Sequence, residues 1–367
     1  KIGLRDLDAV PGKIFNSDQV KKDRERLIKA GYFSEVSVPE ISETLPGKGT
    51  AINIEYKVKE KPTNRVDVGI ELDRDIVLGF LSVGRNHFLM PTDVLTGKIQ
   101  IGTDESNMLA VRTYALKYYQ PWLLNLMPIS LETAFWDEHA RQRLSSGSTQ
   151  SSSLYENIRI GGSIAFGIPL IKDFMLFTTK YKNENIEPND SLLSDMDVES
   201  YAIRSLAGNL SFSTVKDSFN PKEGGYCSFE VEKGGKIGSL FDLGGITFDR
   251  YSANAAIFQS LSNDLIAGTH LFVGLIKPDD PSLKTFETEA YEVGGSGSLR
   301  GYKESSPFLG QRSIVWNTEL RKNFNSSLQG VLFFDAGKAF DSGFSLDPST
   351  FYKGAGFGFR FFRIHSK

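Results

Sequence analysis

The sequence predicts a mainly β protein, namely an antiparallel up-and-down membrane β-barrel preceded by a small α+β domain. Three observations lead to this fold class. The chain is rich in glycine and phenylalanine, with 35 Gly and 27 Phe among 367 residues. Alternation with a period of two dominates after the first sixty residues, and no apolar run approaches the roughly 18 residues of a spanning helix. The longest polar connections also fall on one side of the strand series, as in outer-membrane barrels.

Composition excludes several functional classes. The net charge of −3 gives no reason to expect nucleic acid as a partner. The single cysteine, Cys227, excludes an internal disulfide and a cysteine metal site, and the four histidines lack metal-ligand spacing. No G-x-S-x-G motif marks a nucleophile. We therefore expect no catalytic residue, no metal site and no cofactor.

Residues 1–62 are expected to form the small domain. The segment "FNSDQVKKDRERLIKAGYF" has a cap candidate at Asn16 or Ser17, and Val20, Leu27 and Ile28 follow at helical spacing. Glycine then follows the last turn, where a helix commonly ends. Segments 32–41 and 51–60 both predict strands, because apolar residues alternate with polar ones in the second.

From about residue 64 the pattern predicts about fourteen strands, and the barrel domain is expected over residues 63–367. In 313–324, for example, Trp316 and Leu320 share one face while Asn317 and Glu319 share the other. The expected strands are 66–72, 76–84, 94–102, 109–119, 129–136, 156–167, 174–182, 201–213, 225–233, 252–260, 265–275, 313–324, 328–337 and 354–362.

The connections favour a membrane barrel over a soluble β-sandwich. The gaps after the fifth, seventh, eleventh and thirteenth strands are long and polar, whereas those after the even-numbered strands are shorter. A Greek-key sandwich has no reason to keep this parity. An outer-membrane barrel does, because its periplasmic turns are short and its external loops long.

The external loop 276–310 contains the stretch "YEVGGSGSLRGYKESSP". Its glycines match neither a P-loop nor a dinucleotide fingerprint. Gly294, Gly295 and Gly297 would instead let the loop fold back into the lumen. Arg300 would then need carboxylate partners. Glu319 and Asp335 are the candidates, because alternation turns Glu319 inward and a carboxylate facing lipid is costly. The competing interpretation is a solvated loop arginine.

These residues carry a resemblance to a known family. Leu299-Arg300-Gly301-Tyr302 resembles the [VL]-R-G-[FY] motif of the BamA-type outer-membrane assembly superfamily. "FFDAGKAF" is similar to the F-x-D-x-G strand of that family, and "TELR" to the strand before it. "LIKAGYFSEVSV" resembles part of a POTRA domain, and "YKVKEKPTNRVDVGI" resembles the junction into the first barrel strand.

The resemblance implies a periplasmic POTRA domain and a 16-stranded barrel in a Gram-negative type of outer membrane. It also implies that the motif arginine is held inside the barrel by Glu319 and Asp335. About fourteen strands are present, so we expect a fragment that begins inside a POTRA domain and lacks the last two strands. Closure of the barrel is then unsupported by these residues.

The function implied is assembly, in which unfolded outer-membrane proteins are received, folded and inserted into the lipid bilayer. Val66, Val68 and Ile70 would belong to the first strand of a lateral seam that accepts an incoming strand. The polar residues of this strand have a second interpretation, which is that they face the lumen. Unfolded clients and accessory periplasmic lipoproteins would be the partners. A two-partner-type secretion pore is the alternative function, and a porin or a barrel enzyme is a third class.

Overall fold

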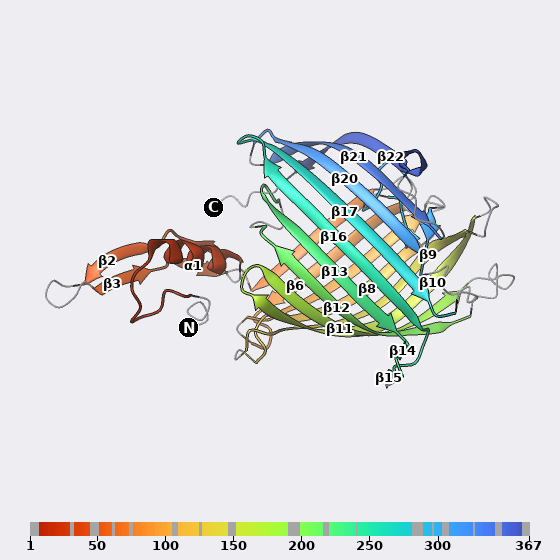
Figure 1. Ribbon diagram of the computed structural model, residues 1–367, viewed down its shortest axis with the longest axis horizontal. Helices are drawn as coiled ribbons and strands as arrows, with labels where there is room; N and C mark the ends of the chain where they lie inside the picture. The colour runs from red at the N-terminus through yellow and green to blue at the C-terminus, as the bar shows by residue number, and fades with distance from the viewer. Residues whose placement is uncertain are drawn as a thin grey trace.

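The structure of the 367-residue chain is a computed structural model. The described residues are 7–29, 33–44, 51–60, 63–72, 76–90, 92–104, 109–124, 127–145, 152–189, 199–215, 220–239, 241–280, 289–295, 297–302, 308–325, 327–341 and 347–361. They form a small N-terminal unit beside a large curved sheet (Figure 1). No helix among them is long and apolar enough to cross a membrane.

The helix of the N-terminal unit is α1 (Ser17–Lys29). Asn16 is its N-cap, because the Asn16 side-chain oxygen accepts hydrogen bonds from the amides of Asp18 (2.9 Å) and Gln19 (3.3 Å). Val20 and Leu27 are buried, as the helical spacing predicts, whereas Ile28 is exposed.

Two antiparallel strand pairs complete this unit. They are β1 (Phe33–Val36) with β4 (Val58–Glu60), and β2 (Glu40–Thr44) with β3 (Ala51–Glu55). The prediction of two continuous strands is wrong here, because both segments are interrupted. Pro39, between β1 and β2, has no amide hydrogen to donate to a neighbouring strand. At the same interruption, the backbone amide of Ser37 donates to the carbonyl of Lys57, which lies between β3 and β4 (2.9 Å).

The fourteen strands expected from the alternation are all present in one antiparallel sheet. Each strand pairs with its neighbours along the chain, so the order from β5 to β22 follows the sequence. The strands are β5 (Asn64–Leu72), β6 (Ile76–Asn86), β7 (Val94–Asp104), β8 (Leu109–Gln120), β9 (Ser130–Ser145), β10 (Ser152–Ile171), β11 (Met175–Asn189), β12 (Tyr201–Ser213), β13 (Gly224–Gly234), β16 (Phe248–Ser260), β17 (Leu265–Pro278), β20 (Arg312–Asn323), β21 (Leu328–Phe340) and β22 (Tyr352–Phe361).

Two short strand pairs and a 3-10 helix lie in the connections, and the alternation did not predict them. They are β14 (Lys236–Ile237) with β15 (Phe241–Asp242), β18 (Tyr291–Glu292) with β19 (Leu309–Gly310), and the helix Pro348–Thr350. The β14–β15 pair lies at the end of the sheet away from α1 (Figure 1). The connections after the sixth, tenth and twelfth strands of the sheet are short, as expected. They join β10 to β11, β16 to β17, and β20 to β21.

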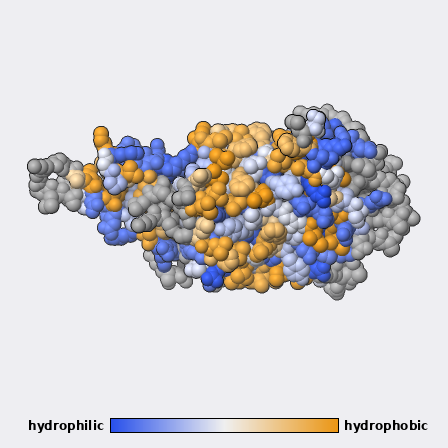
Figure 2. All heavy atoms as spheres, turned by 90° about the horizontal axis from the view of Figure 1, so that it is seen from below, coloured by the Kyte–Doolittle hydropathy of each residue, from blue (hydrophilic) through white to orange (hydrophobic). Residues whose placement is uncertain are grey.

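The two faces of the sheet differ in chemistry. Side chains on the convex face are largely apolar, for example Phe135 (62% exposed) and Phe357 (75% exposed). Figure 2 shows this apolar surface as a band across the middle of the sheet, with hydrophilic side chains gathered beyond it. An apolar band of this kind is what a barrel presents to lipid. The concave face, which we call the lumen, carries most of the buried charged side chains of the sheet.

Candidate functional site

The glycine-rich loop enters the lumen between β17 and β20. Strand β17 continues to Pro278, so the loop begins later than the expected residue 276. Gly295 (φ +75°) and Gly301 (φ +94°) have left-handed backbones that side chains disfavour. These two positions let the chain turn around the motif, and the amide of Gly295 donates to the carbonyl of Tyr302 (3.1 Å).

Arg300 contacts both carboxylates expected from the sequence. Its Nε and Nη2 donate to the two oxygens of Asp335 (2.8 and 2.7 Å), and its backbone amide donates to Asp335 as well (3.0 Å). Its Nη1 donates to Glu319 (2.6 Å). The guanidinium also lies 3.8 Å from the centroid of the Phe333 ring. Arg300 is therefore bound in the lumen, and the solvated-loop interpretation is wrong.

Two further arginines complete this cluster. Arg321 Nε donates to Glu319 (2.8 Å), and Arg360 Nη2 lies 3.0 and 3.1 Å from the two oxygens of the same carboxylate. Neither residue was predicted from the sequence. Alternation could have found them, because Arg321 is two residues after Glu319 and Arg360 occupies a lumen position of β22.

The glycine-rich loop between β17 and β20, which carries the motif Leu299-Arg300-Gly301-Tyr302 and which we call the motif loop, is also packed against the barrel wall. Leu299 is fully buried with Val293 and Val315. A Cβ on Gly354 would overlap the carbonyl oxygen of Arg300, so only glycine permits this approach of β22 to the motif. The Tyr302 hydroxyl donates to the carbonyl of Lys353 (3.2 Å).

The other glycines of the motif loop behave differently from one another. The amide of Gly294 donates to the Ser298 hydroxyl (2.8 Å), which donates back to the Gly294 carbonyl (2.6 Å). Gly297 is exposed, and a Cβ there would meet nothing within 4 Å. Close packing therefore requires a glycine at position 354 of the wall rather than at position 297 of the loop.

The structure does not bring β5 to Arg300. In the described sheet β5 and β22 are the two end strands, and no pairing joins them. Following the register across the sheet places Val66, Val68 and Ile70 on the convex face, where they are 62–74% exposed. Arg65 and Asp67 face the lumen and form an ion pair with each other (2.8 Å), as the second interpretation of this strand expects.

A second charged cluster, which was not predicted from the sequence, lies in the lumen near the start of the motif loop. Its centre is Glu289, whose side chain is only 6% exposed and contacts Arg159 and Arg250. The members of this Glu289 cluster come from strands β10, β11, β12, β13, β16 and the loop, and are Arg159, Lys182, Glu184, Tyr201, Glu232, Arg250 and Glu289. Their separation in sequence left no local pattern to find.

Within the described ranges, no group of three or more His, Cys, Asp or Glu side chains could hold a metal ion. The buried acids of both lumen clusters face arginines instead. The arrangement thus supports positioning of a loop by charge, and its chemistry is that of binding.

Known proteins share both parts of this architecture. The Omp85 superfamily domain matches residues 98–361, and the POTRA domain, described as a surface antigen variable number repeat, matches residues 4–61. The chain belongs to the Omp85 superfamily. Members of this superfamily are membrane transport and assembly proteins and are non-enzymatic.

Solved barrels share the fold of the Omp85 chain. BamA from Haemophilus ducreyi lacking POTRA domains 1–3 has a TM-score of 0.59 and 14% identity, over 98% of this chain and 75% of that chain. CdiB from Acinetobacter baumannii has a TM-score of 0.68 and 14% identity, over 99% and 65%. CdiB from Escherichia coli has a TM-score of 0.63 and 16% identity, over 98% and 67%. At these identities the likeness concerns the fold.

A curated plant protein is similar over a shorter stretch of the Omp85 chain. Outer envelope protein 39, chloroplastic, from Arabidopsis thaliana is 36% identical over 75 residues, which are 20% of this chain. The match covers 21% of that protein, or about a fifth of its length. The Omp85 chain is thus a β-barrel membrane protein of a bacterial outer membrane or a chloroplast envelope.

Proposed function

We propose that this Omp85 protein folds β-barrel proteins and inserts them into the outer membrane of a Gram-negative type of cell. Residues 1–62 would lie in the periplasm as a POTRA domain, and residues 63–367 would belong to the barrel. Unfolded outer-membrane proteins would be its clients, and accessory periplasmic lipoproteins would assist. Clients would dock on the POTRA unit and leave through a lateral seam beside β5.

The observation that carries this proposal is the position of β5 at one edge of the described sheet. An edge strand has unpaired backbone amides and carbonyls that can accept another strand by β-augmentation. The convex face of β5 is apolar at Val68 and Ile70, each 74% exposed, so a client strand added beside it would continue an apolar surface. On the lumen face, Gly69 has no side chain and the ring of Phe80 covers it.

The Arg300 cluster supports the same proposal by holding the far part of the barrel wall. Arg300 joins the loop to Glu319 on β20 and Asp335 on β21, while Arg360 adds β22. The strands near one end of the sheet are thus fixed by charge. An opening at the seam would then move β5 and its neighbours rather than this wall.

The POTRA unit offers a second surface for an extended client. The β2–β3 pair is a two-stranded ribbon, and apolar Ile41 (51% exposed) lies on it. Val38, between β1 and β2, is 73% exposed. Exposed apolar side chains beside strand edges fit an unfolded, amphipathic chain in transit.

A photo-crosslinking amino acid at Val68 tests the seam in living cells. We expect crosslinks from position 68 to many newly made outer-membrane proteins. Phe135 is the matched control, because it is 62% exposed on the same convex face but belongs to β9 in the middle of the sheet. Equal capture of clients from both positions would contradict a seam at β5. Depletion of the protein should also lower the levels of many outer-membrane proteins together.

A two-partner-type secretion pore is the second candidate, and the charged lumen favours it. Arg159, Glu184, Glu232 and Arg250 line the interior, and such a surface suits the passage of a hydrophilic unfolded chain. In that case depletion would remove one large exoprotein from the culture medium and leave outer-membrane proteins at their normal levels. Position 68 would then capture no clients.

A further inference from the structure

We propose that Glu289 is a second anchor of the motif loop, opposite in charge to Arg300. The segment from Glu289 to Arg300, which we call the strap, would be held against the lumen wall at both ends. This inference is independent of whether the barrel inserts clients or exports a protein, because it concerns the resting position of the loop.

Three wall residues donate to the Glu289 carboxylate. Arg159 Nη2 and the Tyr201 hydroxyl (2.8 Å) donate to Oε1, and Arg250 Nη2 donates to Oε2 (3.1 Å). These donors come from β10, β12 and β16. A carboxylate that is 6% exposed and accepts from two guanidinium groups and a phenol is a built site rather than a chance surface contact.

The wall around Glu289 is short of negative charge without it. Arg159 also contacts Glu184 (3.3 Å), and Arg250 contacts Glu232 (3.0 Å). Lys182 lies 3.7 and 3.6 Å from these two acids. The wall therefore contributes three cations and two carboxylates to the Glu289 cluster. With Glu289 from the loop, the cluster has three cations and three carboxylates. Departure of Glu289 from the wall would therefore leave an uncompensated positive charge in a poorly hydrated site.

Apolar packing fills the strap between its two charged ends. The Tyr291 ring packs edge-on against Phe272, with ring centroids 5.8 Å apart. Gly274 allows this approach, because a Cβ there would overlap the Tyr291 ring. Val293 and Leu299 are both 0% exposed. Between Glu289 and Arg300, the described part of the strap thus makes apolar contacts with the wall through Tyr291, Val293 and Leu299.

The opposite charges of the anchors also fix the direction of the strap. Glu289 meets arginines on β10 and β16, whereas Arg300 meets carboxylates on β20 and β21. A shift that brought Glu289 toward Glu319 or Asp335 would place carboxylates together. Like charges at close range in a poorly hydrated site are unfavourable, so the observed direction of the strap is preferred over the reversed one.

A buried thiol reports the opening of the strap. Val293→Cys in the full-length protein, with Cys227→Ser to remove the natural thiol, places a cysteine that reacts with a maleimide only when the strap leaves the wall. We expect Glu289→Gln to raise the labelling rate about tenfold or more, since charge-assisted hydrogen bonds are lost. Arg300→Ala should raise it similarly, and the double variant should exceed both.

Glu292→Gln is the matched control. It removes the same charge from the same loop at an exposed side chain, and it lies closer in sequence to the reporter. Any direct effect of charge on the thiol would therefore be larger in the control than in Glu289→Gln. We expect the control to change the labelling rate much less than Glu289→Gln does, because the Glu292 side chain is exposed whereas that of Glu289 is 6% exposed.

The proposal is overturned if Glu289→Gln labels at the parent rate while Arg300→Ala labels faster, because the loop would then have one anchor. It is also overturned if both glutamate variants accelerate labelling equally. Heat-modifiable migration verifies that each barrel is folded. If Glu289→Gln does not fold, Arg250→Lys replaces it. That variant keeps the positive charge but loses the guanidinium whose two nitrogens donate to Glu289 and Glu232, so it should accelerate labelling by a smaller factor than Glu289→Gln. Labelling of Arg250→Lys at the parent rate would also overturn the proposal.

Discussion

Arg300 owes its position to the shape of the guanidinium as much as to its charge. The planar group reaches Asp335 with two nitrogens and Glu319 with a third, while its face stacks on Phe333. An ammonium is a compact point charge and has no face to stack. The geometry therefore selects arginine over lysine at this position.

Arg300→Lys tests this selection. We expect the lysine to reach one of the two acids, and the loop to lose about 2 kcal/mol or more of its anchoring free energy. Protease sensitivity of the motif loop in reconstituted protein is the measurement, and it should rise toward that of Arg300→Ala. A lysine variant as resistant as the parent would show that charge alone holds the loop.

Gly354→Ala makes a second test at the residue scale. The added methyl group would overlap the carbonyl oxygen of Arg300, so β22 or the motif must move, at a cost of about 1–3 kcal/mol. Gly358→Ala is the control, because it lies on the same strand and lumen face and a Cβ there meets nothing within 4 Å. Urea titrations of heat-modifiable migration should separate the two variants. Equal midpoints would contradict the close approach.

The direction of a side chain could be predicted where its own strand contained the necessary information. Glu319 could be assigned to the lumen from the alternation of its strand, and Asp335 because a carboxylate facing lipid is costly. Glu289 could not be found in this way. It lies in a loop, and its contact with Arg159 spans 130 positions in the chain, a separation that no local pattern encodes.

At the scale of elements, alternation was a sufficient guide to the sheet. All fourteen strands expected from it are present, and the residues 201–213 coincide with β12. Alternation is strong there because one face meets lipid and the other meets a charged interior. The paired elements β14–β15 and β18–β19 have two residues per strand, too few to show any period. The strands of the N-terminal unit are divided where Ser37 and Lys57 hydrogen-bond to each other, which is a contact between segments distant in the sequence.

The convex face makes a prediction at the element scale. Leu116→Arg would place a charge in the apolar band of β8, where Leu116 is 47% exposed, and should cost about 2–4 kcal/mol in folding into a bilayer. Thr113→Arg is the control on the same strand, since Thr113 faces the lumen opposite Glu138. Folding yields in liposomes over a urea series should fall for position 116 alone. Equal losses at both positions would contradict the assignment of the faces.

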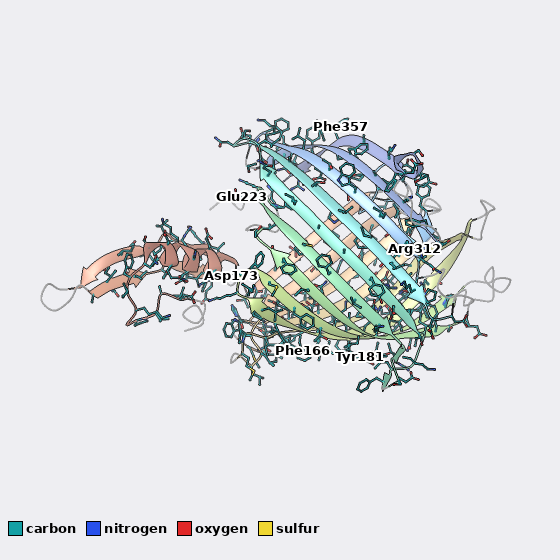
Figure 3. The ribbon with its side chains drawn as sticks, in the orientation of Figure 1. Phe166, Asp173, Tyr181, Glu223, Arg312 and Phe357 are labelled. Atoms are coloured by element: carbon teal, nitrogen blue, oxygen red, sulfur yellow. The ribbon has the colours of Figure 1, made fainter. Side chains whose placement is uncertain are left out.

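At the scale of the whole molecule, ion pairs join the N-terminal unit to the sheet. Arg26 of α1 contacts Asp173 (2.6 Å) in the turn between β10 and β11, and Lys172 contacts Asp8 (3.3 Å). Figure 3 shows Asp173 at the end of the sheet nearest the N-terminal unit and Arg312 toward the opposite end. The turn 172–174 is thus both a hairpin connection and a contact between domains.

This contact predicts a dependence on pH. The hydrogen bond from Arg26 lowers the pKa of Asp8 below its ordinary 3.8, burial opposes this effect, and Lys172 adds to the lowering. A lowered pKa means that the contribution of Asp8 is complete above 3.8 and is lost as the pH falls through the lowered value. Spin labels on α1 and on β11 should therefore keep a fixed distance from about pH 7 to about pH 4, and separate below that.

Lys172→Met supplies the control for the pH experiment. Without the lysine, part of the attraction on Asp8 is absent at every pH, so the acid transition in the distance between the labels should shrink. A transition of undiminished size would assign the separation to other carboxylates of the N-terminal unit.

The contacts at the two ends of the strap are expected to form at different stages of folding. The partners of Arg300 lie 19 and 35 residues further along the chain, whereas Arg159 lies 130 residues before Glu289. Because the entropy lost on closing a loop grows with its length, the contacts of Arg300 form more readily from an unfolded chain. The carboxyl-terminal hairpins with their loop are thus expected to fold as an early unit, and capture of Glu289 to mark the moment when the two halves of the wall meet.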